Sequence, residues 1–273
     1  MLTGLLNLDF LPADLYFLVN LRPVNLLVMN SKKKVAKKTP ELNKYRKGVV
    51  LVIAGTEQYP GAAVLTVGGA RRGGAGFVKY FFKYVTPRDL VLQQFPDVVP
   101  VTKTKAAKAD AIVMGPGNAF HRQIPDDCPL ILDAIAIKGV SRFKNKIKII
   151  TPHTGEAAQL GFTIISKEKS AKEIAQKINS ICVLKGKNTV VATPDGKTFT
   201  DKLGGDELAT AGTGDVLAGL IGAMIAAEKP ESVDAAFKVV CAAVTRHSKA
   251  GKLAKRKTKF VTAVEVLSAL AAV

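Results

Sequence analysis

One short segment of the sequence combines a glycine-rich turn with an acid, a pairing suited to phosphate chemistry. Residues 210–214 read Thr-Ala-Gly-Thr-Gly and lead directly to Asp215, which starts a predicted helix over residues 215–227. Glycine lets the backbone approach a ligand closely, and the free N–H groups at a helix start bind phosphate. Because a bound phosphate repels a carboxylate, Asp215 is suited to handle a proton or a cation beside it. The structural alternative is that Thr213 caps the helix and Asp215 complements its dipole.

The elements that must position this segment alternate between strands and helices. Short apolar runs, typical of strands buried on both faces, occupy residues 49–53, 76–82, 111–114, 130–133, 147–150 and 181–184. Helical patterns occupy residues 61–70, 166–178, 215–227, 232–249 and 262–272, and a Pro-Asp-Gly turn joins residues 190–192 to 198–199 as a hairpin. This alternation predicts an α/β fold whose mostly parallel sheet is covered by helices on both faces.

Clusters of glycine and polar residues follow the predicted strands. They are Gly55 with Tyr59 and residues 61–63, then residues 115–118, Asp133, residues 151–156 and residues 185–189. Ligands bind at the carboxyl ends of the strands in an open α/β sheet. Each cluster alone is compatible with ordinary turn chemistry, and Lys185 alone with a solvated surface charge. Their common position on one rim of the sheet favours a binding site.

The chain has 273 residues and a formal net charge of +18, most of which is concentrated in two runs. Residues 31–48 hold eight Lys or Arg residues against Glu41 alone, and residues 249–259 hold six without an acid. Nucleic-acid binding is one interpretation of such runs. No basic strand with interspersed aromatic residues, zinc pattern or recognition helix accompanies them. A basic surface on a protein with anionic small-molecule ligands is therefore favoured.

The first part of the chain is interpreted as an N-terminal extension. Residues 1–38 end in a lysine-rich linker, and residues 39–273 are expected to form one catalytic domain. The apolar residues near the start are interrupted before they reach the roughly 18 that a membrane span needs, and no leader cleavage site follows them. Cys128, Cys182 and Cys241 lie far apart in or beside apolar stretches, which is typical of the reducing cytoplasm.

The order of these segments resembles the ribokinase-like superfamily and, within it, most closely the NAD(P)H-hydrate dehydratases. The resemblance extends over residues 44–272 and has no counterpart for the residues before them. The segments that carry it are Lys47-Gly48, Tyr59 with Gly61-Ala62-Ala63, Gly74-Ala75-Gly76, Gly115-Pro116-Gly117, Leu132-Asp133-Ala134, Thr151-Pro152-His153 with Gly155-Glu156, Lys185-Gly186 with Thr189, and residues 210–219. The Gly-Thr-Gly-Asp segment alone fits the whole superfamily, whereas the combination is specific.

The resemblance implies a ribokinase-like three-layer α/β/α fold and an enzyme that repairs hydrated NADH and NADPH. In this reaction ADP or ATP phosphorylates the hydroxyl of the hydrate, and phosphate is then eliminated. Asp215 is the implied catalytic base. Mg²⁺ is the implied cofactor that bridges the nucleotide oxygens, with no protein ligands assigned to it. The resemblance also implies a homotetramer or homodimer with small-molecule partners. No membrane partner is expected, and a nucleic-acid partner is not favoured because no recognition motif accompanies the basic runs.

The resemblance also assigns binding roles to individual residues. Those expected to contact the hydrated nicotinamide nucleotide are Ala63, Gly117, His153 and Asp215. Those expected to hold the adenine nucleotide are Lys185, Gly186, Lys187, Asn188, Thr189, Ala211, Gly212, Thr213 and Gly214. The donor itself stays open between ADP and ATP, because both use the same phosphate cradle.

The sequence departs from the family pattern at three places. Ile135 stands where the family commonly has a second Asp, Thr154 replaces a usual Pro, and residues 205–207 read Gly-Asp-Glu in place of Asn-Pro or a similar pair. Loss of the second acid is expected to weaken cation handling. The presence of Asp215 and His153, together with Glu156, indicates an active enzyme.

Two other functions are compatible with the same residues. One is a small-molecule kinase of this superfamily, acting on a hydroxymethylpyrimidine or a thiazole alcohol, which uses Asp215 but stops after phosphoryl transfer. The other is a non-catalytic protein that binds nucleotides or nucleic acid through its basic runs. Activity on hydrated NADH, measured separately with ADP and with ATP, distinguishes all three.

Overall fold

The computed structural model describes residues 45–105 and 107–273. The strands in these residues are β1 (Val49–Ile53), β2 (Phe77–Phe81), β3 (Val99–Val101), β4 (Ala111–Met114), β5 (Leu130–Leu132), β6 (Lys148–Ile150), β7 (Ile181–Leu184), β8 (Thr189–Ala192) and β9 (Thr198–Asp201). They form one sheet in the order β3-β2-β1-β4-β5-β6-β7-β8-β9. Neighbours from β3 to β7 are parallel, whereas β8 is antiparallel to both β7 and β9. The predicted parallel sheet and the predicted hairpin are confirmed.

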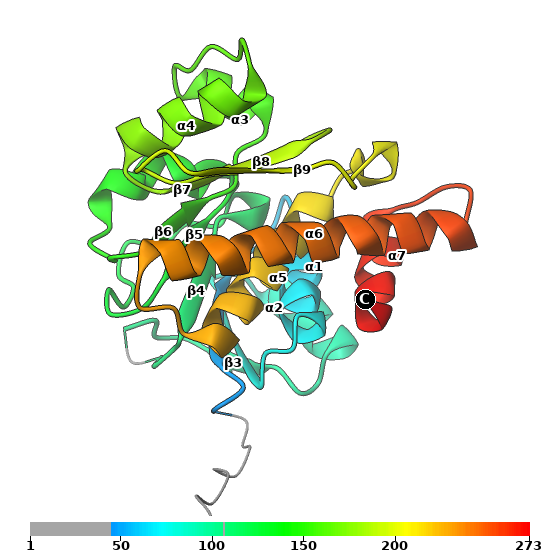
Figure 1. Ribbon diagram of the computed structural model, residues 1–273. Helices are drawn as coiled ribbons and strands as arrows, with labels where there is room; N and C mark the ends of the chain where they lie inside the picture. Colours follow the sequence, from blue (N-terminus) through cyan, green and yellow to red (C-terminus); the bar gives the residue numbers. More distant parts are fainter. Residues whose placement is uncertain (1–44, 106) are drawn as a thin grey trace, which may run out of the picture. The chain divides into compact units, whose positions relative to one another are not determined.

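Helices cover both faces of this sheet (Figure 1). The α-helices are α1 (Pro60–Arg72), α2 (Val85–Gln94), α3 (Thr154–Gln159), α4 (Lys167–Ile178), α5 (Thr213–Glu228), α6 (Val233–Lys257) and α7 (Ala263–Ala269). The 3₁₀ helices are η1 (Pro116–Asn118), η2 (Ala134–Arg142), η3 (Asp206–Leu208) and η4 (Leu270–Ala272). α1, α5, α6 and α7 pack on one face, and η2, α3 and α4 pack on the other. The three-layer α/β/α fold is confirmed.

The two layers of core explain why the central strands are continuously apolar. Successive side chains of a strand point to opposite faces of the sheet. Val50 and Val52 of β1 therefore join the core beneath α1, α5 and α6, while Leu51 and Ile53 join the core beneath η2, α3 and α4. Every residue of β1 is buried, because both of its faces are covered.

Close packing of α1 against α5 fixes where α5 begins. A Cβ added to Gly219 of α5 would lie 2.0 Å from the carbonyl oxygen of Thr66 on α1, so the two backbones approach to a distance that only glycine permits. α6 packs in turn against α5, across the front of the molecule in Figure 1. This packing places the first turn of α5 at the carboxyl rim of the sheet, beside the start of α1.

Several elements differ from the sequence-based predictions: the short helix α3 and the 3₁₀ helices η1, η2 and η3 were not predicted, and three further differences have a clear physical reason. α6 continues to Lys257 instead of ending at residue 249, because Gly251 lies inside the helix and lets it pack on Leu208, whose Cδ2 would be 2.7 Å from an added Cβ. β3 was not predicted; it has three residues, includes Pro100 and lies at the edge of the sheet, where proline is tolerated. α2 was not predicted either, because it buries only Pro87 and Val91.

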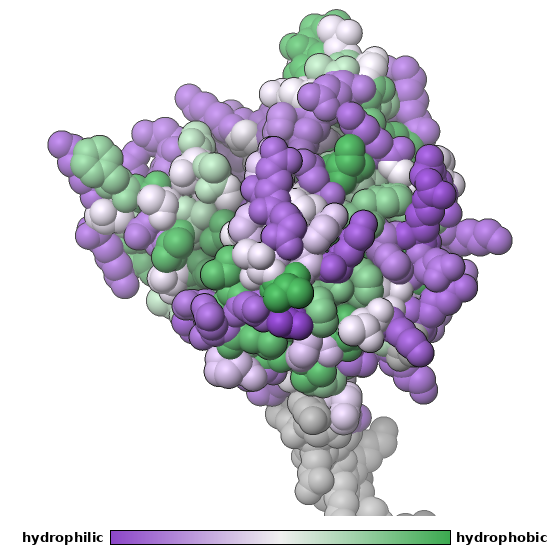
Figure 2. Space-filling model, turned by 180° about the vertical axis from the view of Figure 1, so that it is seen from behind, coloured by the Kyte–Doolittle hydropathy of each residue, from purple (hydrophilic) through white to green (hydrophobic). Residues whose placement is uncertain are grey.

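The surface mixes hydrophilic and hydrophobic side chains. On the face opposite α6, hydrophilic residues cover most of the periphery and hydrophobic areas are small and separated (Figure 2). None of the helices in residues 45–105 and 107–273 combines the length and hydropathy that a membrane-crossing segment needs. The predicted extension over residues 1–38 and most of the first basic run lie outside the described residues. The second basic run ends α6, where Lys255 pairs with Asp206 at 2.6 Å.

Candidate active site

A wide cleft lies at the point where the strand order reverses direction. β1 has β2 on one side and β4 on the other, and ligands of open α/β sheets bind at such a switch point, beyond the carboxyl ends of the strands. The cleft has a volume of about 710 Å³ and is lined after β1 by Tyr59 and Ala62 and after β4 by Gly117. His153 and Asp215 complete its wall. Three of the four residues predicted to contact the hydrate therefore line one cleft.

Ala63, the fourth of these residues, does not line the cleft. Its exposed fraction is 0%, and it lies under Gly55, where an added Cβ would be 2.7 Å from the Ala63 Cβ. The neighbouring Ala62 lines the cleft in its place. On a helix, adjacent residues differ by about 100° in direction, so a one-residue offset turns a lining position into a core position.

The glycine-rich turn leaves the start of α5 without a side-chain cap. The N-cap residue is Gly212, with φ at 90°, where an added Cβ would also lie 2.4 Å from a methyl carbon of Leu65. The hydroxyl of Thr213 donates to the carbonyl oxygens of Leu208 and Thr210, at 2.8 and 2.9 Å. The interpretation of Thr213 as a cap is therefore wrong: its hydroxyl anchors the turn. The N–H groups of Gly214 and Asp215, in the first turn of α5, have no acceptor within the helix and can face an anion, whereas that of Thr213 makes a long hydrogen bond of 3.4 Å to the carbonyl oxygen of Thr210.

Asp215 lies half-buried in the first turn of α5. Burial raises the pKa of Asp215 to about 7, and the negative charges of Asp133 and Glu156 add to this effect, while Lys185 opposes it. A carboxylate with a pKa near neutrality exchanges a proton readily at physiological pH. Complementing the helix dipole alone would not require a pKa this high, so the position suits a general base.

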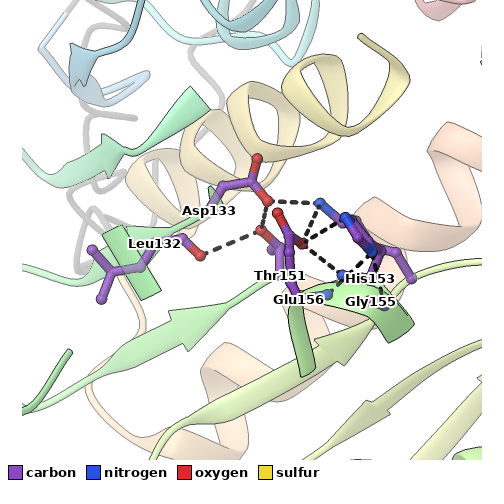
Figure 3. Close-up of polar contacts among 7 residues, drawn as sticks. Leu132, Asp133, Thr151, His153, Gly155 and Glu156 are labelled. Atoms are coloured by element: carbon purple, nitrogen blue, oxygen red, sulfur yellow. Dashed lines mark hydrogen bonds and ion pairs between the residues drawn. The ribbon is translucent and has the colours of Figure 1, made fainter. Parts of the chain in front are cut away.

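A polar network joins the ends of β5, β6 and β7 (Figure 3), and its charged members act on Asp215 through their electric field. Asp133 follows β5, is 3% exposed, and accepts hydrogen bonds from Thr151 at 2.6 Å and from Lys185 at 2.7 Å. The ammonium of Lys185 also lies 3.9 Å from Glu156. Burial lowers the pKa of Lys185, but the surrounding carboxylates outweigh this and leave its pKa above the ordinary value. Lys185 is therefore a cation held at the rim of the sheet, not a solvated surface charge.

His153 begins α3 through a reciprocal capping arrangement. Its Nδ1 accepts hydrogen bonds from the backbone N–H groups of Gly155 and Glu156, at 3.0 and 3.3 Å. The Glu156 carboxylate in turn accepts from the backbone N–H of His153 at 2.8 Å. Since Nδ1 is an acceptor, the proton of the neutral ring is on Nε2. The side chain is 56% exposed, so this N–H can reach a ligand in the wide cleft.

A second, narrower cavity adjoins the turn on its other side. Its volume is about 90 Å³, and six of the residues predicted to hold the nucleotide line it: Lys185, Gly186, Lys187, Thr189, Thr213 and Gly214. Ala211 and Gly212 line the wide cleft instead, and Asn188 lines neither space. An added Cβ on Gly214 would be 3.1 Å from the Lys185 ammonium, so these two residues are neighbours, as predicted.

Sequence reasoning missed eight residues of the narrow cavity, and two of these have polar side chains. His247 and Ser248 on α6 both line it. His247 lies three residues after Val244 and four before Gly251, and thus on the buried stripe of an amphipathic helix. A histidine on the buried face of a helix was a signal that the sequence offered. The predicted helix, which ended at residue 249, gave no indication that this histidine lies near the glycine-rich turn.

The described residues contain no group of three or more His, Cys, Asp or Glu side chains placed to hold a metal ion. Mg²⁺ usually keeps several waters and binds through one or two carboxylates together with substrate phosphates. Glu156 and Asp215 line the wide cleft together. This donor set fits a Mg²⁺ ion that arrives with a nucleotide, not one held by the protein alone.

The chain is similar in sequence to proteins of one family. A family model described as NAD(P)H-hydrate dehydratase matches residues 50–271. An ADP-dependent (S)-NAD(P)H-hydrate dehydratase of Bacillus subtilis (strain 168) is 35% identical over 68% of this chain and 75% of its own length. The bifunctional NAD(P)H-hydrate repair enzyme Nnr of Mycobacterium leprae (strain TN) is 34% identical over 69% of this chain. The match covers only 43% of that bifunctional relative, so the chain spans less than half of its length.

Solved structures show the same fold. A crystal structure of the ADP/ATP-dependent NAD(P)H-hydrate dehydratase from Bacillus subtilis, co-crystallized with ATP/Mg²⁺, has a TM-score of 0.71 and 28% identity, covering 86% of this chain and 91% of that chain. A ribokinase-like superfamily protein from Enterococcus faecalis V583 has a TM-score of 0.74 at 24% identity, over 86% of this chain and 89% of its own. The predicted ribokinase-like architecture is confirmed.

Proposed function

The chain belongs to the NAD(P)H-hydrate dehydratase family, and we propose that it restores NADH and NADPH from their hydrates with ADP or ATP as phosphoryl donor. One observation carries this proposal. Asp215, a carboxylate whose pKa burial raises to about 7, lies where a dinucleotide-sized cleft meets the uncapped start of α5. A proton acceptor is thereby placed beside a phosphate-binding site, as phosphoryl transfer to a hydroxyl requires.

The first step forms a phosphate ester. Asp215 removes the proton from the hydroxyl of the hydrate, and the oxygen attacks the terminal phosphorus of the nucleotide. The bond from that phosphorus to the bridging oxygen breaks, and the shortened nucleotide leaves with the electron pair. The N–H groups of residues 211–214 and the start of α5 stabilise the charge that develops on the transferred group.

The second step releases phosphate. Hydroxide is a poor leaving group, whereas phosphate is a good one. The lone pair of the ring nitrogen forms a C=N double bond as the C–O bond breaks, and phosphate leaves with the electrons of the C–O bond. Loss of a proton from the neighbouring ring carbon then restores the dihydronicotinamide. Bound Mg²⁺ would neutralise charge on the phosphates, and Glu156, at the wall of the wide cleft, is the carboxylate that would hold it. Ile135, which replaces the family's usual acid, offers no ligand.

The two spaces divide the ligands by size. The wide cleft of about 710 Å³ suits the hydrate, which would contact Gly117, the Nε2–H of His153 and Asp215. The narrow cavity of about 90 Å³ suits part of a nucleoside, with its phosphates toward Lys185 and Gly214. The glycine-rich turn lies between the two spaces, because Ala211 and Gly212 line the wide cleft whereas Thr213 and Gly214 line the narrow cavity.

The function is tested by incubating the purified protein with hydrated NADH and either ADP or ATP. Formation of NADH together with phosphate supports the proposal, and the faster of the two reactions identifies the donor. Phosphorylation of a hydroxymethylpyrimidine or thiazole alcohol, without NADH formation, would instead indicate the kinase. Nucleotide binding without turnover of either substrate would indicate a non-catalytic protein.

The pH dependence of the reaction should follow the ionisation of Asp215. Only the deprotonated carboxylate can accept a proton, and burial raises its pKa to about 7. We therefore expect kcat/KM to rise with pH through about 7 and to level off above it. A pH series at saturating nucleotide measures this. A rate that is flat down to the ordinary titration range of carboxylates, near about 4, would contradict the role of Asp215 as base.

Deletion of residues 1–38 is expected to leave catalysis unchanged. All site residues described above lie between Tyr59 and Ser248. Steady-state rates of the truncated and full chains with hydrated NADH compare them directly. A truncated protein that folds and binds nucleotide but has no activity would show that this segment completes the site.

Two further parts of the proposal concern the surroundings of the enzyme. Cys128 and Cys182 are buried free thiols, and Cys241 is also unpaired, which supports a reducing compartment such as the cytoplasm.

We also propose that the protein forms a homodimer or homotetramer. Sedimentation or light scattering of the full chain measures the assembly, and a monomer at all concentrations would overturn this part.

A further inference from the structure

A histidine that no step of the proposed reaction uses lines the narrow cavity. His247 lies on α6 and shares the cavity wall with Thr213 and Leu217 from the start of α5. The residue is only 5% exposed. Its position follows from the packing of α6 on α5, the same packing that fixes the phosphate-binding turn.

The Nε2 atom of His247 is buried and finds no hydrogen-bond partner among the described residues. Burial lowers the pKa of His247 to about 4; the backbone of Thr213 opposes this shift, and the positive charge of Lys185 adds to it. The ring is therefore neutral at physiological pH. A buried polar nitrogen without a partner destabilises the protein, and a ligand that supplies the partner recovers that free energy.

The other uncharged polar side chains of the cavity wall already have partners: the hydroxyls of Thr189 and Thr213 donate to backbone carbonyl oxygens. Leu208, Leu217 and Val244 make much of the wall apolar. The hydroxyl of Ser248 is already engaged, because it donates to the buried carboxylate of Asp201. A mostly apolar cavity with few polar groups is typical of sites that bind the flat, partly apolar portion of a small molecule.

The phosphates have their own partners at another part of the cavity. Lys185 and Gly214 lie beside each other there, at the start of α5. A neutral imidazole contributes no charge toward a phosphate, whereas it can donate to or accept from a base nitrogen or a ribose hydroxyl. His247 is thus suited to the uncharged portion of the nucleotide.

We propose that His247 is a specificity-determining residue, whose Nε2 forms a hydrogen bond with the nucleoside portion of the phosphoryl donor. This inference rests on the proposed function, because it requires the nucleotide to occupy the narrow cavity. This contact would let the protein bind ADP and ATP more tightly than bare polyphosphates. A bare polyphosphate can contact only the phosphate-binding turn and Lys185.

Two amide variants separate the roles of the two ring nitrogens. In His247→Gln the side-chain amide reaches about the position of Nε2, whereas in His247→Asn it reaches only that of Nδ1. Binding of ADP and ATP, measured by calorimetry without the hydrate, is expected to be roughly 5- to 150-fold weaker for His247→Asn. His247→Gln is expected to retain most of the affinity. Tripolyphosphate should bind to all three proteins equally.

The controls and outcomes separate this inference from the proposed function. His121→Asn makes the same change at a histidine that lines neither space and should leave ADP binding unchanged. Inosine diphosphate and 2′-deoxy-ADP then show whether the base or the ribose is the partner. The nucleotide that lacks the contacted group should bind wild type and His247→Asn with the same affinity. If wild type binds neither ADP nor ATP, the proposed function fails and this inference with it. Two results would overturn only the role of His247 while wild type still binds ADP. In the first, His247→Asn binds ADP as tightly as wild type; in the second, its affinity for tripolyphosphate falls as much as its affinity for ADP.

Discussion

Replacing Asp215 by Asn is expected to lower kcat for the dehydration by about 10²–10⁴-fold, the usual contribution of a general base. The two side chains have nearly the same shape, but an amide cannot accept the proton of the hydrate hydroxyl. Steady-state rates with hydrated NADH and either nucleotide measure the loss. Nucleotide binding should persist, because Asp215 lines the wide cleft and not the narrow cavity.

The same variant should not be less stable than wild type at neutral pH. The pKa of Asp215 in the folded protein, about 7, lies above that of an unfolded chain, so the folded state binds more protons in between. Ionisation of Asp215 therefore destabilises the fold as pH rises through this range, and Asn has no such penalty. Thermal unfolding checks this. Asp97→Asn, at an exposed carboxylate paired with Arg71, is a matched control expected to keep full activity. Activity of Asp215→Asn within a few-fold of wild type would leave Asp215 only its helix-dipole role.

Three strands that are buried on both faces could be predicted from sequence to the residue, and β5 to within one residue. β1, β4 and β7 coincide with the predicted runs over residues 49–53, 111–114 and 181–184. All their side chains are buried, because helices cover both faces, so apolar character begins and ends with the strand. β3 lacked this signal: two of its three residues are exposed, and its proline is compatible with a strand only at an edge.

The site could be predicted where one local segment determines it. The turn over residues 210–214 needs a left-handed residue at Gly212, and glycine there is visible in the sequence. The pairing of Lys185 with Asp133 joins residues 52 positions apart, and only the sheet order brings them together. His247 was missed for a related reason. Its stripe on α6 predicts burial, but its neighbours across the cavity come from α5 and from the loop after β7.

Replacing Lys185 by Met should weaken nucleotide binding and also shift the pH profile. Met keeps the length of the side chain and removes the charge. A lost charge-assisted hydrogen bond to phosphate is worth about 1.5–3 kcal/mol, so the apparent constant for ADP or ATP should rise roughly 10- to 150-fold. The constant for the hydrate should hardly change, because Lys185 lines only the narrow cavity. If the constant for the hydrate changed instead, the assignment of the two spaces would be inverted.

The pH shift distinguishes Lys185 from a residue that only contacts the nucleotide. Lys185 lowers the pKa of Asp215, whereas Asp133 and Glu156 raise it. Without the cation, the pKa of Asp215 should rise, so the midpoint of the pH–rate profile should move to higher pH. Part of the activity that the variant loses at neutral pH should therefore return at higher pH. Lys187→Met, at an exposed lysine on the rim of the same cavity, should give a smaller loss that fades with salt and no shift of the midpoint. An unchanged midpoint in Lys185→Met would show that Lys185 holds the nucleotide without tuning the base.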